Sequence, residues 1–413
     1  MASPRPMNRL LLGDVGTGKT LVAAHALAVA VDAGTQAAMM APTEVLASQY
    51  SEAVGSLLDT AGVHWALLTG STPASERRVL LQGLADGTIQ VAFGTHALLQ
   101  ESVSFKRLSL AIVDEQHRFG VNQRLGLRGK GAAADLLVMT ATPIPRSLAL
   151  TLYGDLDTSC LRERPLARKA VKTSLVKQSQ RERAYEHVRA VVRAGQQAYV
   201  VCALVDESEA AEARAATREV ERLRTQVFPD LNVGLLTGRM KPAEKRRAMQ
   251  DFRDRRIDVL VATTVIEVGV DVPNATIMII EDADRFGLAQ LHQLRGRVGR
   301  GDQPGEIYLF ADPKSADGKD RMHAIVTTSD GFELAEYDLR QRGEGHILGD
   351  RQHGMPALRL ASVLDDVELI EMTRADARVI VEADPHLKRP EYGPLLREVQ
   401  RVYREAWQWV SSG

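Results

Sequence analysis

Residues 9–20 read RLLLGDVGTGKT, an apolar strand followed by a glycine-rich turn and the start of a helix. Glycines in such a turn let backbone N–H groups surround a phosphate, whose charge the helix N-terminus favours. The lysine reaches the outer phosphates, and the hydroxyl that follows it can bind Mg²⁺. A glycine turn with a chance lysine is the alternative, but the strand before it and the helix after it argue against that. The predicted phosphate-binding residues are Gly13, Gly16, Thr17, Gly18, Lys19 and Thr20.

Apolar, β-rich segments recur along the chain between helical stretches. The first series is expected at residues 9–13, 37–41, 89–95, 110–115 and 136–142. A second series is expected at residues 197–205, 233–238, 258–264, 276–283 and 306–312. Strands separated by helices predict an α/β fold with parallel, doubly wound sheets.

The two series match each other in sequence. ALLTGSTPASERR, from Ala66, resembles GLLTGRMKPAEKRR, from Gly234, and IQVAFGT, from Ile89, resembles IDVLVAT, from Ile257, at the same offset of 168 residues (66 to 234 and 89 to 257). Two similar lobes explain this match. We predict lobes at 1–157 and 173–325, joined by a charged, proline-containing linker at 158–172. A C-terminal helical part should follow at 326–413, with its last helix near 395–410.

Composition excludes some classes of protein. With 413 residues, 45% of them hydrophobic, the chain is long enough for two or three globular domains. Its 52 basic and 53 acidic residues mean that nucleic-acid binding would need local basic surfaces. The sequence has no long apolar run and no apolar core of a secretory signal near its start, so we expect a cytoplasmic protein. Cys160 and Cys202 lack ligand spacing and predict idle or buried thiols.

Paired acids end the strand expected at 110–115. Asp114 can hold Mg²⁺ through water, and Glu115 can polarise the water that attacks a γ-phosphate. Such a pair alone is usually a solvated strand end. Its place after the P-loop, at the end of a long apolar strand, favours the catalytic interpretation. His117 is ambiguous, because a lone histidine is often structural.

Residues 290–300 read QLHQLRGRVGR and place Arg295, Arg297 and Arg300 within six residues. A charge run is usually a solvated face. Here the arginines alternate with glycines and apolar residues, as expected of a turn pressed against an anion. An arginine presented across a cleft to the γ-phosphate would make hydrolysis depend on closure of the lobes.

The chain resembles superfamily 2 helicases along essentially its whole length. The matching segments are GDVGTGKT (13–20), APTEVLA (41–47), GTHALLQ (94–100), DEQHRFG (114–120), TATPIPR (140–146), TTVIEVGVDVP (263–273) and QLHQLRGRVGR (290–300). The combination of DEQHRFGV with TATPIPRSLALTLYGDLD resembles bacterial DNA helicases that remodel stalled replication forks and Holliday junctions in recombination and repair. The motor of transcription-repair coupling factors is similar and is a further alternative.

The resemblance implies two RecA-like lobes, ATP and Mg²⁺ as cofactors, and double-stranded and branched DNA as the partner. It further implies a monomer, with single-stranded-DNA-binding or replication-fork proteins as candidate partners. For ATP it implies Lys19, Thr20, Asp114, Glu115, Gln293, Arg297, Arg300, Gly269 and Asp271. For the DNA backbone it implies Thr43, Gly94, Thr95 and Thr263, contacts that position DNA without reading its sequence. For coupling of hydrolysis to movement it implies His117 and, in a translocation hairpin after Ser329, Arg342, Arg351 and Gln352.

The resemblance also has a departure. Members of this group carry an N-terminal wedge domain and an adenine-contacting segment before the P-loop, and this sequence has only a few residues there. We therefore expect a fragment with reduced fork specificity and a less strict preference for ATP. A catalytically impaired DNA-binding or assembly module and an RNA helicase are the alternatives. The intact P-loop, acids and arginines argue against the first, and the hairpin argues against the second.

Overall fold

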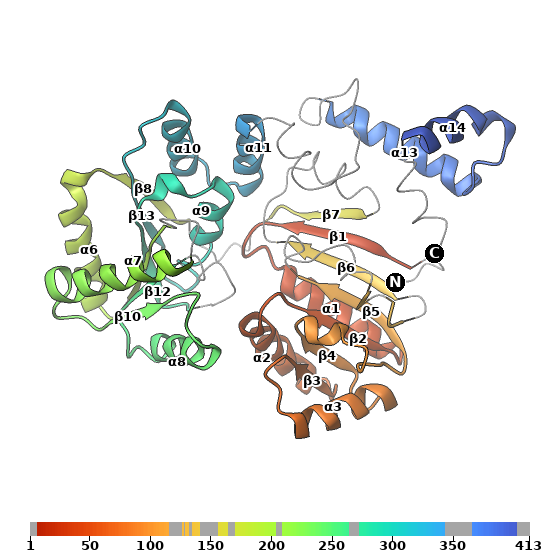
Figure 1. Ribbon diagram of the computed structural model, residues 1–413, viewed down its shortest axis with the longest axis horizontal. Helices are drawn as coiled ribbons and strands as arrows, with labels where there is room; N and C mark the ends of the chain where they lie inside the picture. Colours follow the sequence, from red (N-terminus) through yellow and green to blue (C-terminus); the bar gives the residue numbers. More distant parts are fainter. Residues whose placement is uncertain are drawn as a thin grey trace. The chain divides into compact units, whose positions relative to one another are not determined.

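The computed structural model describes residues 6–114, 126–127, 129–131, 134–140, 156–163, 170–203, 209–263, 272–342 and 366–402 (Figure 1). By its internal contacts the chain forms two compact units, Met1–Pro143 with Ser159–Leu334, and Ile144–Thr158 with Ala335–Gly413. The first unit contains two sheets, each with its own helices, and we refer to these as lobe 1 and lobe 2.

Lobe 1 is built on a seven-stranded sheet in the order β3-β4-β2-β5-β6-β1-β7. Its strands are β1 (Asn8–Gly13), β2 (Gln36–Met40), β3 (Trp65–Leu68), β4 (Val91–Gly94), β5 (Leu108–Val113), β6 (Asp135–Thr140) and β7 (Asp157–Leu161). The helices α1 (Lys19–Asp32), α2 (Glu44–Thr60) and α3 (Ala74–Asp86) connect successive strands, and a 3-10 turn, η1 (His96–Leu99), follows β4. The pairings from β3 through to β1 are all parallel.

Lobe 2 repeats this plan with a six-stranded parallel sheet in the order β10-β11-β9-β12-β13-β8. Its strands are β8 (Lys172–Val176), β9 (Gln197–Val201), β10 (Val233–Leu236), β11 (Val259–Ala262), β12 (Ala275–Ile280) and β13 (Glu306–Phe310). Its helices are α6 (Arg181–Arg193), α7 (Glu209–Arg222), α8 (Pro242–Arg253), α9 (Leu288–Arg295) and α10 (Ala316–Thr327). The predicted fold class, two α/β lobes with parallel sheets, is confirmed.

Buried strands explain why the sequence folds this way. β2, β4, β11 and β12 are buried at every position, as expected for a parallel sheet that is covered on both faces. The core of lobe 1 includes Leu27 of α1 and Phe93 of β4, and that of lobe 2 includes Val188 of α6 and Phe228. Removal of such side chains from water stabilises each lobe by about 1.5–3 kcal/mol per residue.

A glutamine in each lobe makes the same set of contacts. Gln36 Nε2 donates to the carbonyls of Leu84 (2.9 Å) and Ile89 (2.7 Å). Gln197 Nε2 donates to the carbonyls of Phe252 (2.6 Å) and Ile257 (2.7 Å). The acceptors are related by the offset of the internal sequence match, 84 to 252 and 89 to 257. Each glutamine satisfies carbonyls where a helix turns into the next strand, so the repeat extends to hydrogen bonding.

The described C-terminal elements are α11 (Gly331–Arg342), α13 (Val367–Ala383), a 3-10 turn, η7 (Pro390–Tyr392), and α14 (Gly393–Val402). Within the second compact unit, Arg374 of α13 donates to the carbonyl of Leu156, and Arg378 forms an ion pair with Asp157. Strand β7 occupies residues that the sequence predicts as the start of the linker. Among the described helices, none has the length and apolar content needed to cross a membrane.

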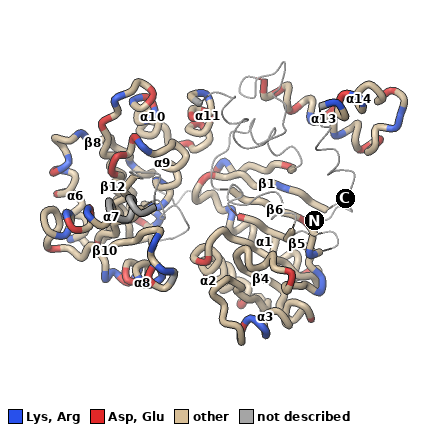
Figure 2. The backbone as a smooth tube through the Cα atoms, in the orientation of Figure 1, with Lys and Arg blue, Asp and Glu red and all other residues tan. Residues whose placement is uncertain are grey.

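Charged residues of both signs are spread over both lobes (Figure 2). This distribution agrees with the formal net charge of −1. Helix α8 concentrates basic residues, because its sequence PAEKRRAMQDFR carries four of them against two acids. Any binding of a polyanion would therefore depend on particular local surfaces and not on the charge of the whole chain.

Candidate nucleotide site

The predicted phosphate-binding loop lies between β1 and α1. Gly16 and Gly18 have positive φ values of 80° and 91°, in the left-handed region that favours glycine. Thr17 is buried, and its hydroxyl and backbone N–H both donate to the Asp14 carbonyl, at 2.9 and 3.3 Å. These contacts curl the loop so that α1 begins at Lys19 with its N-terminus open to an anion.

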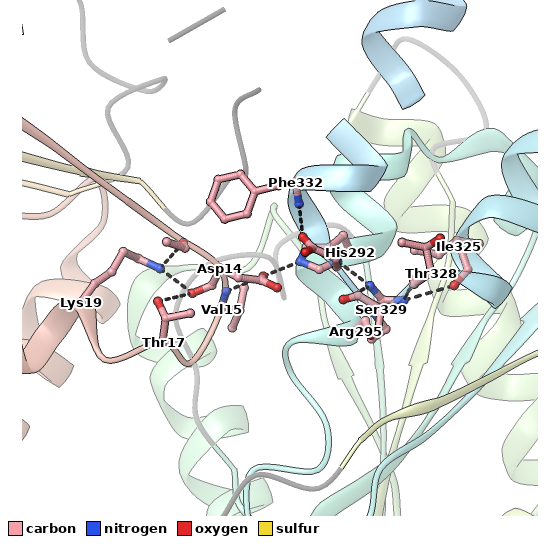
Figure 3. A network of polar contacts seen from close by, with 12 residues as sticks. Asp14, Val15, Thr17, Lys19, His292, Arg295, Ile325, Thr328, Ser329 and Phe332 are labelled. Carbon is pink, nitrogen blue, oxygen red and sulfur yellow. Dashed lines mark hydrogen bonds and ion pairs between the residues drawn. The ribbon is translucent and has the colours of Figure 1, made fainter. Parts of the chain in front are cut away.

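Lys19 is held over the loop by its backbone carbonyls. Its Nζ donates to the carbonyl of Gly13 at 2.6 Å and to that of Asp14 at 2.8 Å (Figure 3). The side chain is half-buried. An ammonium group placed in this way can exchange a carbonyl for a phosphate oxygen without a large movement of the chain.

Asp114 follows β5 directly and is buried, with 4% of its surface exposed. Its backbone N–H donates to the Met40 carbonyl at 3.0 Å, and its carboxylate accepts a hydrogen bond from the Tyr50 hydroxyl on α2. A carboxylate together with the Thr20 hydroxyl suits Mg²⁺, which prefers oxygen ligands and keeps several waters. Among the described residues no group of three or more His, Cys, Asp or Glu forms a metal cluster.

The arginine-rich turn follows α9. Gln293 is buried at 9% exposure, and Arg297 and Arg300 are half-buried. Arg300 Nε donates to the Gly296 carbonyl at 2.7 Å and so closes the turn. A Cβ at Gly296 would lie 2.6 Å from Cγ1 of Val15 in the P-loop, so only glycine allows this approach. The turn that carries the arginines thus lies against the phosphate-binding loop.

A second contact links the same two segments. Nε2 of His292, on α9, forms a hydrogen bond with the Asp14 carboxylate, and both residues are buried (Figure 3). Arg295 lies beside them, with its Nη2 2.7 Å from His292 Nδ1. Its guanidinium also donates to three backbone carbonyls, those of Ile325 (3.1 Å), Thr328 (2.7 Å) and Ser329 (3.0 Å). Sequence reasoning missed both side-chain roles, since Arg295 looks like a third member of the arginine run.

Comparison with known proteins shows which proteins this chain is similar to. Three family models match successive segments: DEAD/DEAH box helicase at 4–151, helicase conserved C-terminal domain at 177–302, and ATP-dependent DNA helicase RecG, domain 3, C-terminal, at 328–412. The ATP-dependent DNA helicase RecG of Bacillus subtilis is 49% identical over 97% of this chain and 58% of its own length. The RecG of Thermotoga maritima is 46% identical over 95% of this chain and 51% of its own length. The chain is similar to RecG helicases along nearly its whole length.

A solved RecG structure agrees with this similarity. A structure described as RecG bound to a three-way DNA junction is 45% identical, with a TM-score of 0.73 over 89% of this chain and 48% of that one. Yeast Dbp5 bound to RNA and ADP BeF3 is 16% identical with a TM-score of 0.59, and it shows the fold alone. The chain spans about half to three fifths of the length of these RecG relatives.

The residues that the RecG resemblance assigns to DNA have varied surroundings. Thr43 is the N-cap of α2, and its Oγ1 accepts from the Leu46 N–H at 3.3 Å. Gly94 ends β4, and a Cβ there would lie 2.3 Å from the Leu68 carbonyl oxygen. Thr95 and Thr263 follow β4 and β11 and are buried at 1% and 2% exposure. Neither hydroxyl has a hydrogen-bond partner in the part of the chain that the structure describes.

Several predicted site residues of this chain lie outside the described ranges: Glu115, His117, Gly269, Asp271, Arg351 and Gln352. Arg342 is the last residue of α11. The roles assigned to these six residues and to Arg342 stay predictions.

Proposed function

We propose that this chain is an ATP-dependent double-stranded DNA translocase or helicase that remodels branched DNA, including stalled forks and Holliday junctions, in recombination and repair. The observation that carries the proposal is the close approach of Gly296 to Val15. It brings the arginine turn of lobe 2 to the P-loop of lobe 1. An ATP site made from both lobes makes hydrolysis depend on how the lobes meet, which is what a motor requires.

In this proposal each residue of the site has its own part in ATP hydrolysis. The P-loop amides and Lys19 bind the phosphates, and Arg297 and Arg300 stabilise charge on the transferred phosphoryl group. Thr20 and Asp114 would hold Mg²⁺, which neutralises charge on the phosphate oxygens when bound. Glu115 acts as the residue that orients and polarises the attacking water.

DNA binding is supported by the matching positions of Thr95 and Thr263. They are related by the repeat offset, 95 to 263, and each backbone N–H donates at 3.3 Å, to Leu68 and to Leu236 respectively. A buried hydroxyl without a partner is costly, by about 1–3 kcal/mol, so two equivalent ones suggest a ligand that supplies acceptors. Phosphate oxygens of a nucleic-acid backbone fit this requirement without any reading of sequence.

The test of this assignment uses the double variant Thr95→Val/Thr263→Val, which keeps shape and removes both hydroxyls. Binding of a labelled branched DNA, followed by fluorescence anisotropy, should weaken in the variant at every DNA sequence tried. Thr88→Val, which removes a hydroxyl from the exposed turn after α3, is the control. Unchanged DNA affinity in the double variant would remove these threonines from the DNA site.

An RNA helicase and a non-catalytic assembly module remain the alternatives to this function. To test the RNA helicase, duplex RNA and duplex DNA of the same sequence are compared as activators of ATP hydrolysis. Stronger activation by RNA would contradict the DNA assignment. Absence of hydrolysis from a folded chain would favour the assembly module.

A further inference from the structure

We propose that Asp14 and His292 form a positioning pair that sets the arginine turn of lobe 2 against the P-loop, and that Arg295 prepares His292 for this role. The pair joins residues 278 positions apart in the sequence. Asp14 belongs to the P-loop, and His292 lies on the helix that leads into the turn. The inference rests on the proposed ATP hydrolysis for its catalytic consequence, but the contact itself can be tested without turnover.

The first step concerns the proton on His292. A guanidinium only donates hydrogen bonds, so the contact of Arg295 Nη2 with Nδ1 makes Nδ1 the acceptor. The ring proton is then on Nε2, and Nε2–H donates to the Asp14 carboxylate. The partners on both sides thus select one tautomer of the imidazole, in which its donor points at the P-loop.

The second step concerns how firmly Arg295 is fixed. Arg295 is buried at 6% exposure, and its three carbonyl acceptors all lie between Ile325 and Ser329, at the end of α10 and just after it. An arginine held by backbone groups cannot turn toward a phosphate without leaving carbonyls unpaired, at a cost of about 1–3 kcal/mol each. Arg295 therefore acts as a support for His292, whereas the proposed function assigns the nucleotide contacts to Arg297 and Arg300.

The third step concerns the P-loop side. Asp14 Oδ1 also accepts the backbone N–H of Val15 at 2.6 Å, so the carboxylate that binds His292 orients the residue which touches Gly296. The side chain of valine is stiff, because its β-branch restricts χ1. The histidine contact and the Val15–Gly296 approach therefore fix the turn at two neighbouring points.

Two ion pairs between the described residues of the lobes are longer and more exposed. Arg246 of α8 lies 3.8 Å from Glu44 of α2, and Arg253 lies 4.0 Å from Glu52. Both pairs include exposed side chains, and exposed ion pairs typically contribute about 0–1 kcal/mol. We therefore expect loss of the buried Asp14–His292 pair to change the position of the arginine turn against the P-loop more than loss of either ion pair.

The first experiment is hydrogen–deuterium exchange on the nucleotide-free chain. His292→Ala should speed exchange in the peptide that covers residues 10–22, and Asp14→Ala should speed exchange in the peptide that covers residues 288–300. A change in one lobe caused by a substitution in the other is the signature of a contact between them. Effects confined to the substituted lobe would overturn the proposal, whether or not the chain hydrolyses ATP.

The second experiment separates the two contacts of the histidine. Glutamine can place an amide N–H near the position of Nε2, whereas asparagine is shorter and reaches only the Arg295 side. Relative to the unsubstituted chain, His292→Asn and His292→Ala should lower kcat for ATP by about tenfold with KM little changed, and His292→Gln should restore most of the loss. A raised KM with unchanged kcat, or no difference between Gln and Asn, would contradict a positioning role.

A double-substitution cycle completes the test. If the pair acts as one unit, Asp14→Ala/His292→Ala should lose no more kcat than either single variant. Losses that multiply would show independent roles and overturn the pairing. If the unsubstituted chain lacks turnover, the proposed function fails, and the exchange experiment alone decides the inference.

Discussion

At the scale of single residues, the P-loop lysine is the simplest place to test the site. Lys19→Ala should abolish ATP binding and hydrolysis together, because Nζ is the group that the loop carbonyls present to the phosphates. Equilibrium binding of a fluorescent ATP analogue and steady-state hydrolysis measure the two effects. Lys314→Ala, which removes an exposed lysine, is the matched control. Retained affinity within about threefold in Lys19→Ala would refute the assignment.

Arg300 should behave differently from Lys19. Arg300→Ala is expected to lower hydrolysis by up to about a thousandfold while ATP binding changes far less, because the arginine acts on charge that develops during phosphoryl transfer. Arg300→Lys keeps a positive charge but loses the Nε donor that closes the turn on Gly296. It should recover only a small part of the activity. Equal losses of binding and hydrolysis in Arg300→Ala would make it a ground-state contact.

Residue types and short spacings were enough to single out the P-loop, Asp114 and the arginine turn as candidates, since each is a local pattern with a local chemical reason. The same reasoning could not find His292, Arg295 or Tyr50. Their contacts depend on which segments the fold brings together, and Tyr50 lies 64 residues from Asp114. A histidine before an arginine run carries no signal of its partner in the sequence alone.

At the scale of secondary-structure elements, the end of β4 is a sensitive position. Gly94→Ala would push a Cβ against the Leu68 carbonyl oxygen of the neighbouring strand β3, at 2.3 Å before relaxation. We expect a loss of stability of about 1–3 kcal/mol, as for other overpacked sites, measured as a lower temperature of unfolding. Gly70→Ala is the control, because its Cβ would meet only the flexible Glu44 side chain, at 3.4 Å. Equal effects of the two substitutions would contradict the close strand approach.

A partly buried ionic cluster in lobe 2 predicts a pH dependence. Glu281 follows β12 and contacts Arg181 at 2.8 Å and the Tyr185 hydroxyl at 3.2 Å. Burial raises the pKa of Glu281 above its ordinary value of 4.5, with the charge of Glu219 acting in the same direction, and burial also raises the pKa of Tyr185 to about 12. A raised carboxyl pKa means that the folded chain holds the proton more tightly than the unfolded chain does.

The stability which that proton contributes is fully present below about pH 4.5 and is lost as pH rises through the raised pKa. Glutamine cannot titrate, so the free energy of unfolding of the unsubstituted chain, relative to that of Glu281→Gln, should fall as pH rises through this window. Denaturant unfolding at a series of pH values measures the difference. Glu221→Gln, at an exposed position of α7, controls for the loss of a carboxylate. A relative stability that rises with pH would reverse the sign assigned to burial.

The strands of both sheets were predictable where they are apolar and buried on both faces. β7, with sequence DTSCL, was not predicted as a strand, because it lies at the edge of its sheet and none of its residues is buried. An edge strand lacks the continuous apolar run that marks the central ones. Residues 158–161 therefore resemble linker in sequence while they pair as a strand.

At the scale of the whole molecule, the repeat in sequence predicted the two lobes, and the glutamine contacts at the same offset give that repeat a structural basis. The predicted boundaries at 157, 172 and 325 stay predictions, as do the hairpin residues. The chain spans 58% of the length of the Bacillus subtilis RecG, so activity on branched DNA is a proposal to be measured on this chain itself.

The most direct measurement is steady-state ATP hydrolysis by the purified chain with and without a synthetic fork DNA, beside Lys19→Ala. If the ATP site is made from both lobes and is coupled to DNA binding, the fork should strongly stimulate ATP hydrolysis, and Lys19→Ala should show no hydrolysis. Absence of turnover in both conditions, from a chain shown to be folded, would contradict the motor and leave the assembly module in its place.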